Sequence, residues 1–312
     1  MYTMVLKMYW TNNTSDFILL GFPIFISKTL FSFLIILLFL MINLLQNMIV
    51  IIITRIDYQL QKPMYFFISN LAFVDILFGA IILPNVMILI LSHRNTVSFL
   101  GCMMQMYFFL AIGVTESFLL AVMSYDRYVA ICNPLKYTGT MTSNVCLFLA
   151  IGCWTGGFLS VILPVIVISQ MKYCSHVINH FFCEISPVLQ LSCQDIHWLQ
   201  ISFTILASVV IFGTFPIIGM SYLKILLNIL GLQLLNSKKK TFSTCATHLI
   251  VVFLYYSTIT FMYIRPKSES NLELDKRVSI FYSVVNPVVN PLIYCLRNNE
   301  IKKSLRKCLR CT

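Results

Sequence analysis

Long stretches with almost no charged residues dominate this chain and restrict what it can fold into. Of its 312 residues, 59% are hydrophobic and 11% are charged, whereas a soluble domain carries about 25% charged residues. A helix needs about 20 mainly apolar residues to cross a bilayer. Seven stretches meet this need, with Asp75 and Glu116 as their only charged residues: 29–54, 63–92, 99–125, 137–171, 199–223, 241–264 and 278–296. They predict an all-α membrane protein, a bundle of seven transmembrane helices.

The distribution of basic residues predicts how these helices are oriented. If the N-terminus lies outside, the cytoplasmic loops and tail hold most of the Lys and Arg residues, including Lys238–Lys240 and the segment 302–310. Cytoplasmic loops are usually rich in basic residues, so we expect the N-terminus outside and the C-terminus inside. We interpret the net charge of +11 as attraction of the protein to the lipids of the cytoplasmic leaflet, and we expect no nucleic-acid partner.

A charged pair, Asp126 and Arg127, lies at the inner end of the third stretch, within Met123–Cys132. Ionised groups in a membrane helix are rare and usually functional. At this position Arg127 could be held by Asp126 and released toward a cytoplasmic partner. The alternative is that the pair only fixes the depth of the helix at the interface.

Four motifs occur in order along these stretches, and each borders a predicted membrane helix. They are Pro63–Asp75 (PMYFFISNLAFVD), Met123–Cys132 (MSYDRYVAIC), Lys240–His248 (KTFSTCATH) and Asn290–Asn298 (NPLIYCLRN). Together they resemble the motifs of vertebrate olfactory receptors of the terrestrial-type class, which are rhodopsin-like G-protein-coupled receptors. The resemblance runs from about Phe17 to Leu309.

This resemblance implies a domain organisation and a function. We expect an extracellular tail (1–28), a seven-transmembrane receptor domain (29–296), and a cytoplasmic amphipathic helix with a short tail (297–312). The protein would bind a small volatile odorant and activate the stimulatory olfactory G protein, which raises cAMP. We expect it in the plasma membrane, in the cilia of olfactory sensory neurons, and we expect no enzyme activity.

The resemblance also assigns a switch at the cytoplasmic end. Arg127 would pair with Asp126 at rest and turn toward the G protein when the sixth helix moves outward. Pro291 would kink the seventh helix, so that Tyr294 changes partners and meets Tyr222 across the bundle. The complete predicted set is Asp126, Arg127, Tyr128, Tyr222, Asn290, Pro291 and Tyr294.

The resemblance places the ligand pocket between the outer halves of the third, fifth and sixth helices. The matching residues are mostly apolar and uncharged: Phe109, Leu110, Gly113, Val114, Leu206, Val210, Tyr256, Ile259, Thr260 and Tyr263. Odorant pockets should be concave and apolar with a few polar groups. We therefore expect a ligand bearing an alcohol, ketone or ester and not an amine or acid.

Two carboxylic acids within the membrane, Asp75 and Glu116, are costly unless they are paired or neutral. Two such groups on adjacent helices could share a structural Na⁺ or a proton, because like charges at close range cannot both ionise unscreened. The resemblance places Asn47, Ser117 and Asn290 near the same cavity. The alternative is two neutral acids hydrogen-bonded to polar neighbours. We expect no other cofactor.

Four cysteines lie in the predicted outer segments, where disulfides form, and four cysteines can pair in three ways. The resemblance implies the pairs Cys102–Cys183 and Cys174–Cys193. The segment His180–Glu184 also resembles a proposed Cu or Zn motif of some olfactory receptors, but a disulfide at Cys183 would remove its thiolate, so we favour structural packing there.

The two ends of the chain carry possible modification sites. Asn12 and Asn13 begin overlapping glycosylation sequons in the predicted extracellular tail. In the C-terminal segment, Ile301, Leu305 and Leu309 form an apolar stripe, and Cys308 and Cys311 are candidates for palmitoylation. The chain also departs from the family at Gln46 and Ser257, where glycine is usual.

Other classes fit the sequence less well. A retinal receptor needs a lysine in the seventh helix, and 278–296 contains none; an amine receptor usually needs an acid in the outer third helix, and 105–115 contains none. A channel or transporter using Asp75 and Glu116 would not need Arg127 or the Asn290–Tyr294 motif. The remaining alternative is a rhodopsin-like receptor for another small ligand outside the olfactory epithelium.

Overall fold

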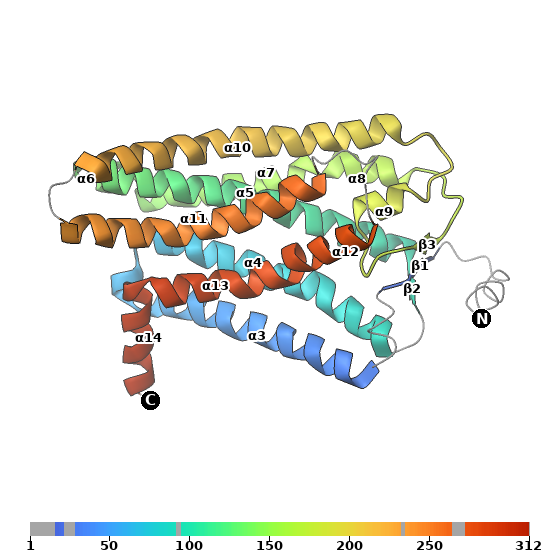
Figure 1. The fold of residues 1–312 in the computed structure, drawn as a ribbon, viewed down its shortest axis with the longest axis horizontal. Coiled ribbons are helices and arrows are strands. Elements are labelled where there is room, and N and C mark those ends of the chain that lie inside the picture. Colours follow the sequence, from blue (N-terminus) through green and yellow to red (C-terminus); the bar gives the residue numbers. More distant parts are fainter. Residues whose placement is uncertain (1–15, 22–28, 92–94, 232–234, 264–271, 312) are drawn as a thin grey trace.

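The structure, a computed structural model, describes residues 16–21, 29–91, 95–231, 235–263 and 272–311. Long helices run roughly side by side along the molecule, and the short helix at the C-terminus turns away from them (Figure 1). The predicted glycosylation sites Asn12 and Asn13 lie outside the described residues, as do the side chains of Cys308 and Cys311.

Within the described residues, six helical segments are long and apolar enough to cross a membrane. They are α3 (Thr29–Ile56), α4 (Pro63–Leu91), α5 (Phe99–Cys132), α7 with α8 (Ser143–Ser160 and Ile162–Ser169), α10 (His197–Gly231), and Cys245–Tyr263 within α11 (Leu235–Tyr263). Many large apolar side chains on their outer faces are exposed, such as Phe148, Val209 and Phe253. A soluble protein would bury such surface, so these faces suit a lipid environment.

The last part of the bundle is one interrupted helix. It comprises α12 (Leu272–Ile280), a π turn (Phe281–Val285) and α13 (Asn286–Arg297). Pro291 has no N–H, so the carbonyl of Pro287 lacks its usual helical donor. The Asn47 amide supplies one at 3.2 Å, and the Gln46 amide donates to the Val288 carbonyl at 3.1 Å. Gln46, the departure from the family pattern, therefore helps to fasten α3 to α13.

Helix α5 lies at the centre of the bundle and packs against α4, α7 and α10. It approaches α7 closely at Gly157, where a Cβ would come within 2.7 Å of the Ala111 carbonyl oxygen. Across α4 and α7, the Trp154 indole donates a hydrogen bond to the Asn70 side chain at 3.1 Å. These contacts fix the positions of α4, α5 and α7 relative to one another.

A small sheet, which the sequence did not predict, lies at one end of the bundle. Strand β1 (Phe17–Leu19) pairs antiparallel with β2 (Thr96–Val97) and parallel with β3 (Val177–Ile178). The segment that carries β3 also holds the short helix α9 (Ile185–Leu189) and both disulfides, Cys102–Cys183 and Cys174–Cys193. The first disulfide ties this segment to the start of α5.

The opposite end is formed by short connections. A 3-10 turn (Tyr58–Leu60) links α3 to α4, and α6 (Pro134–Thr140) links α5 to α7. Helix α14 (Asn299–Cys311) follows α13 and is oriented across the bundle (Figure 1). Ile301 is 1% exposed and belongs to the main core, so the first residue of the predicted apolar stripe of this helix packs against the helix bundle.

Candidate functional site

An apolar cavity of about 70 Å³ lies among α5, α10, α11 and the π turn. Its lining is almost entirely aliphatic or aromatic and contains no charged residue. The described lining residues are Leu110, Gly113, Val114, Ser117, Val161, Ile185, Phe203, Leu206, Ala207, Val210, Ile211, Tyr255, Ile259, Tyr263 and Tyr282. A concave apolar site with a few polar groups is the usual form of a small-molecule pocket.

Hydroxyl groups are grouped at one side of this cavity. The Tyr255 hydroxyl donates a hydrogen bond to the Gly113 carbonyl and lies 2.7 Å from the Ser117 hydroxyl. The Tyr282 hydroxyl has no hydrogen-bond partner among the described residues and lies so close to residue 113 that a Cβ there would clash with it. Glycine at position 113 is therefore what allows Tyr282 to approach α5.

Most of the residues predicted for the pocket line this cavity: Leu110, Gly113, Val114, Leu206, Val210, Ile259 and Tyr263. Three do not. Phe109 is buried against Phe78, Phe182 and Tyr282. Tyr256 donates its hydrogen bond to the Thr214 hydroxyl at 2.7 Å, and Thr260 is exposed.

Sequence reasoning missed the contribution of the last bundle helix to this cavity. Tyr282 lies in the π turn, where an extra residue per turn shifts side chains relative to a regular helix. Helical spacing alone does not predict such a turn. The following Asn286 and Pro287 were the signal that helix geometry changes nearby.

The two membrane carboxylic acids meet near the centre of the bundle. The Asn290 amide donates to Asp75 Oδ1 at 3.1 Å and also interacts with the Glu116 carboxyl group. The Asn43 amide donates to the backbone carbonyl of Asp75 at 3.2 Å. The side-chain oxygens of Asn43 and Asn47 are buried and have no hydrogen-bond partner in the described part of the chain. The described residues contain no cluster of three or more His, Cys, Asp or Glu side chains that could hold a metal ion.

At the inner end of α5, the expected ion pair between Asp126 and Arg127 is not formed. Asp126 is buried and accepts a hydrogen bond from the Tyr137 hydroxyl at 2.9 Å. Among the described side chains, Arg127 forms no ion pair. Arg127 instead lines a small gap between α4, α11 and α13, and its Nε atom is buried without a hydrogen-bond partner.

The predicted meeting of Tyr222 and Tyr294 is also not present as a hydrogen bond. The Tyr222 hydroxyl lies 2.7 Å from His248 Nδ1, and this contact connects α10 to α11. The Tyr294 hydroxyl is buried without a hydrogen-bond partner among the described residues. Both Tyr294 and His248 border the gap that Arg127 lines. The side chains of Lys238–Lys240 lie outside the described residues.

Next to Ile185, which lines the apolar cavity, a buried polar cluster joins the disulfide-bonded loop to α12. His180 Nε2 lies 3.1 Å from Glu184 Oε2, which also accepts a hydrogen bond from Ser279 at 3.0 Å. Burial, and then the charge of Lys276, lowers the pKa of His180 to about 3. His180 is therefore neutral, and because Cys183 is in a disulfide, this cluster suits packing better than metal binding.

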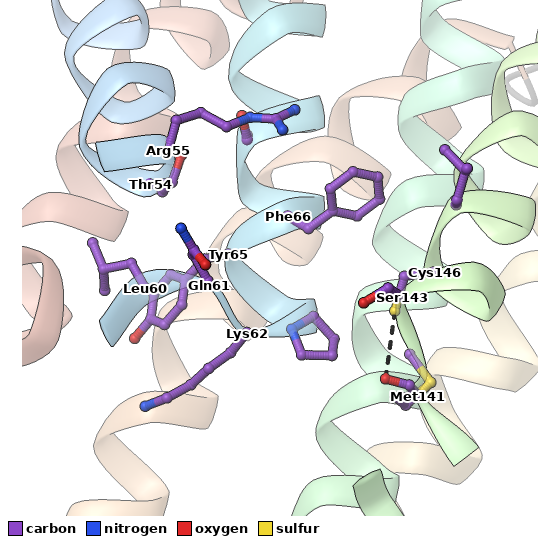
Figure 2. A pocket seen from close by; sticks show the side chains of 13 residues that line it. Thr54, Arg55, Leu60, Gln61, Lys62, Tyr65, Phe66, Met141, Ser143 and Cys146 are labelled. Carbon is purple, nitrogen blue, oxygen red and sulfur yellow. Dashed lines mark hydrogen bonds between the residues drawn. The ribbon is translucent and has the colours of Figure 1, made fainter. Parts of the chain in front are cut away.

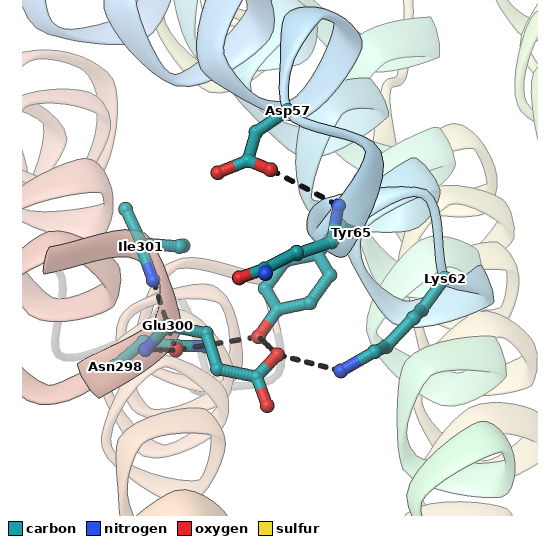
Figure 3. A network of polar contacts seen from close by, with 7 residues as sticks. Asp57, Lys62, Tyr65, Asn298, Glu300 and Ile301 are labelled. Atoms are coloured by element: carbon teal, nitrogen blue, oxygen red, sulfur yellow. Dashed lines mark hydrogen bonds and ion pairs between the residues drawn. The ribbon is translucent and has the colours of Figure 1, made fainter. Parts of the chain in front are cut away.

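Helix α14 is attached to the turn between α3 and α4 by a polar network (Figure 3). The Glu300 carboxylate accepts from Lys62 Nζ at 2.8 Å and from the Tyr65 hydroxyl at 2.8 Å. Asn298 caps the start of α14 by accepting from the Glu300 N–H at 2.9 Å. Burial on its own would raise the pKa of Glu300, but the bonds from Lys62 and Tyr65 hold it below its ordinary value.

Comparison with known proteins agrees with this architecture. A family model described as "Olfactory receptor" matches residues 35–311. The chain is 43% identical to human Olfactory receptor 6Y1 over 100% of this chain and 96% of that protein. It is 44% identical to human Olfactory receptor 6B1 (95% of each chain). It is 41% identical to Olfactory receptor 226 of Rattus norvegicus (96% of this chain, 93% of that protein). The chain therefore belongs to the olfactory receptor family of G-protein-coupled signalling receptors, which are not enzymes.

Proposed function

We propose that this protein is an odorant receptor that binds small, volatile, mostly apolar molecules in the cavity lined by Gly113, Val210 and Tyr282. The observation that carries the proposal is the composition of this cavity, which combines apolar walls with hydroxyl groups and contains no charge. A ligand oxygen, in an alcohol, ketone or ester, could accept a hydrogen bond from the unpartnered Tyr282 hydroxyl. An amine or acid would have no opposite charge there and would lose its hydration.

We further propose that the receptor has seven membrane spans, with α12 to α13 as the seventh. We propose that the disulfide-bonded loop and the N-terminus lie outside, because basic residues are concentrated near the other end of the bundle. Disulfides form in the oxidising extracellular environment, which favours the same orientation. The site of action would be the plasma membrane of olfactory cilia.

The proposed partner at the inner end is the stimulatory olfactory G protein, which raises cAMP. Arg127 supports this proposal because it is half-buried, forms no ion pair with an acid of the described chain, and lines a gap together with His248 and with Tyr294, a residue of the predicted switch. Outward movement of α11 would widen this gap and expose the guanidinium. A buried donor without a partner is costly, so binding the G protein would satisfy it.

The odorant proposal is tested by measuring cAMP in cells that express the receptor with the stimulatory olfactory G protein, against a panel of volatile compounds. We expect Val210→Trp, which fills the cavity, to abolish the response to an active compound. Its neighbour Val209 is 64% exposed on the outer face, so Val209→Trp should respond normally. Equal responses from both variants would contradict this site, and an undiminished response from Arg127→Ala would contradict the switch.

We also propose that Asp75 and Glu116 share a sodium ion. The buried, unpartnered oxygens of Asn43 and Asn47 support a cation nearby, because hard cations prefer oxygen ligands. A bound ion would screen the two carboxylates and hold α3, α4 and α5 together. The test is thermal unfolding of the purified receptor in sodium or in potassium salts. Sodium should raise the melting temperature of the wild type but not of Asp75→Asn, and identical curves for the wild type in both salts would reject the site.

A further inference from the structure

A second and larger cavity, of about 470 Å³, lies far from the apolar one, at the end of the bundle that carries α14. It is bounded by the end of α3, the start of α4 and the start of α7 (Figure 2), and several of its lining residues are exposed. The proposed odorant and G-protein sites use none of its lining residues. Under the proposed orientation, this cavity lies at the level of the inner leaflet.

The cavity carries positive charge and no negative charge. Its lining includes Arg55 and Lys62 and contains no Asp or Glu. Lys62 extends away from Arg55 in Figure 2 and is bound to Glu300 at 2.8 Å. Arg55 is exposed and has neither an ion pair nor a hydrogen bond with any described residue. Its guanidinium is therefore available to an anion.

Hydroxyl and amide groups accompany Arg55. Ser69 is 6% exposed, lines the cavity, and makes no side-chain hydrogen bond with the described residues. Ser143 and Gln61 line the opening and likewise have unused side-chain donors within the described chain. A guanidinium with several neutral donors is the set that recognises phosphate oxygens.

The remaining walls are apolar and lead to lipid. Phe66 and Leu147 line the cavity, and Leu147 is 52% exposed. Next to the cavity, Ile52 on α3 and Phe148 on α7 present exposed apolar side chains to the surroundings. A molecule bound here would contact polar groups at one end and the acyl-chain region of the bilayer at the other.

We propose that this cavity binds the phosphate headgroup of an anionic phospholipid of the inner leaflet, with Arg55 as its main charged contact and Phe66 and Leu147 against its acyl chains. A free phosphate compound would use the polar groups but not the apolar walls. The inference rests on the proposed orientation of the receptor, but it does not depend on odorant binding or on G-protein activation. A lipid here would bridge α3, α4 and α7.

The test is native mass spectrometry of the full-length receptor released from nanodiscs of phosphatidylcholine containing a minor fraction of phosphatidic acid. We expect the wild type to retain phosphatidic acid, and Arg55→Gln to retain it with about fivefold lower affinity, the effect of one basic residue at an anionic surface. Arg55→Lys should lie between them. The matched control is Lys136→Gln, which removes one charge from α6 at the same end of the bundle, outside the cavity.

Three outcomes would overturn the proposal. Equal losses from Arg55→Gln and Lys136→Gln would mean that only general surface charge attracts the lipid. Full displacement of phosphatidic acid by equimolar glycerol 3-phosphate would mean that the acyl chains contribute nothing. The variant Leu147→Asp keeps Arg55 but puts a negative charge where the phosphate and the acyl chain would lie. If it retained phosphatidic acid as well as the wild type does, the lipid would have to bind elsewhere. Labelling an N-terminal epitope on intact cells tests the orientation separately.

Discussion

The hydroxyl of Tyr137 on α6 donates a hydrogen bond to the buried carboxylate of Asp126 over 2.9 Å. Burial, followed by the charge of Asp126, raises the pKa of Tyr137 above its ordinary value, so the hydroxyl remains a donor. This bond occupies one oxygen, Oδ1, of the acid that was expected to hold Arg127, whereas Oδ2 is buried without a hydrogen-bond partner among the described residues. Under the proposed function, this contact lets the loop between α5 and α7 influence whether Arg127 is available to the G protein.

Replacing Tyr137 with Phe should lower the response to an active odorant. Without its donor, Asp126 is free to pair with Arg127 and withdraw it from the G protein. A hydrogen bond to a charged group contributes about 1.5–3 kcal/mol, so the concentration for half-maximal cAMP should rise about tenfold or more. Tyr125 is exposed and makes no such bond with the described residues, so Tyr125→Phe is the control. An unaltered dose–response curve for Tyr137→Phe would contradict this role of the bond.

The apolar cavity should be sensitive to a single methyl group at position 113. In Gly113→Ala the new Cβ would clash with the Tyr282 hydroxyl, and overpacking of this kind costs about 1–3 kcal/mol. Tyr282 would move into the cavity, and we expect about tenfold lower odorant potency in the cAMP assay. A Cβ on Gly213 of α10 meets no atom within 4 Å, so Gly213→Ala should behave as the wild type. Similar potency for both variants would exclude Gly113 from the pocket.

The general architecture could be predicted from the sequence because membrane helices depend on the length and the apolarity of a stretch of chain. The nearly uncharged stretches predicted the membrane helices, and α3 and α4 begin at the predicted residues, 29 and 63. The pairings of Cys102 with Cys183 and of Cys174 with Cys193 came from the family resemblance, since composition left three alternatives. Both pairings are present in the structure.

The partners of individual polar groups could not be predicted in the same way. Asp126 and Arg127 are adjacent in sequence, yet Asp126 meets Tyr137 of α6 while Arg127 lines the gap beside α13. Tyr282 reaches the cavity through a π turn that no regular spacing indicates. Such choices depend on how helices far apart in the sequence pack together.

The contact between α5 and α7 should be intolerant of side chains at Gly157. A Cβ there would come within 2.7 Å of the Ala111 carbonyl oxygen and 2.9 Å of the Thr115 nitrogen, which are backbone atoms and cannot move aside. We expect Gly157→Ala to lose about 1–3 kcal/mol of stability, measured as a lower melting temperature of the purified receptor. Gly152 on the same helix faces open space, so Gly152→Ala should be neutral. Equal melting temperatures for the two variants would show that α7 does not approach α5 this closely.

The attachment of α14 should weaken in acid. The pKa of Glu300 is below its ordinary value of 4.5 because, against the effect of burial, Lys62 and Tyr65 stabilise the carboxylate. A lowered pKa in the attached state means that the stabilisation is present above pH 4.5 and is lost as the pH falls through the lowered pKa. Because Lys62 and Glu300 are about half exposed, the effect should be modest and screened by salt.

The measurement is the distance between spin labels on α4 and α14 in the purified receptor, followed from neutral pH to below the ordinary pKa of Glu300. The wild type should show separation only at the acidic end, whereas Glu300→Gln, which cannot ionise, should show partial separation at every pH. Asp16→Asn removes a carboxylate at the far end of the molecule, beside β1, and should retain the wild-type pH profile. If the profile of Glu300→Gln instead followed that of the wild type, α14 would be held by the packing of Ile301 in the core and not by its ion pair.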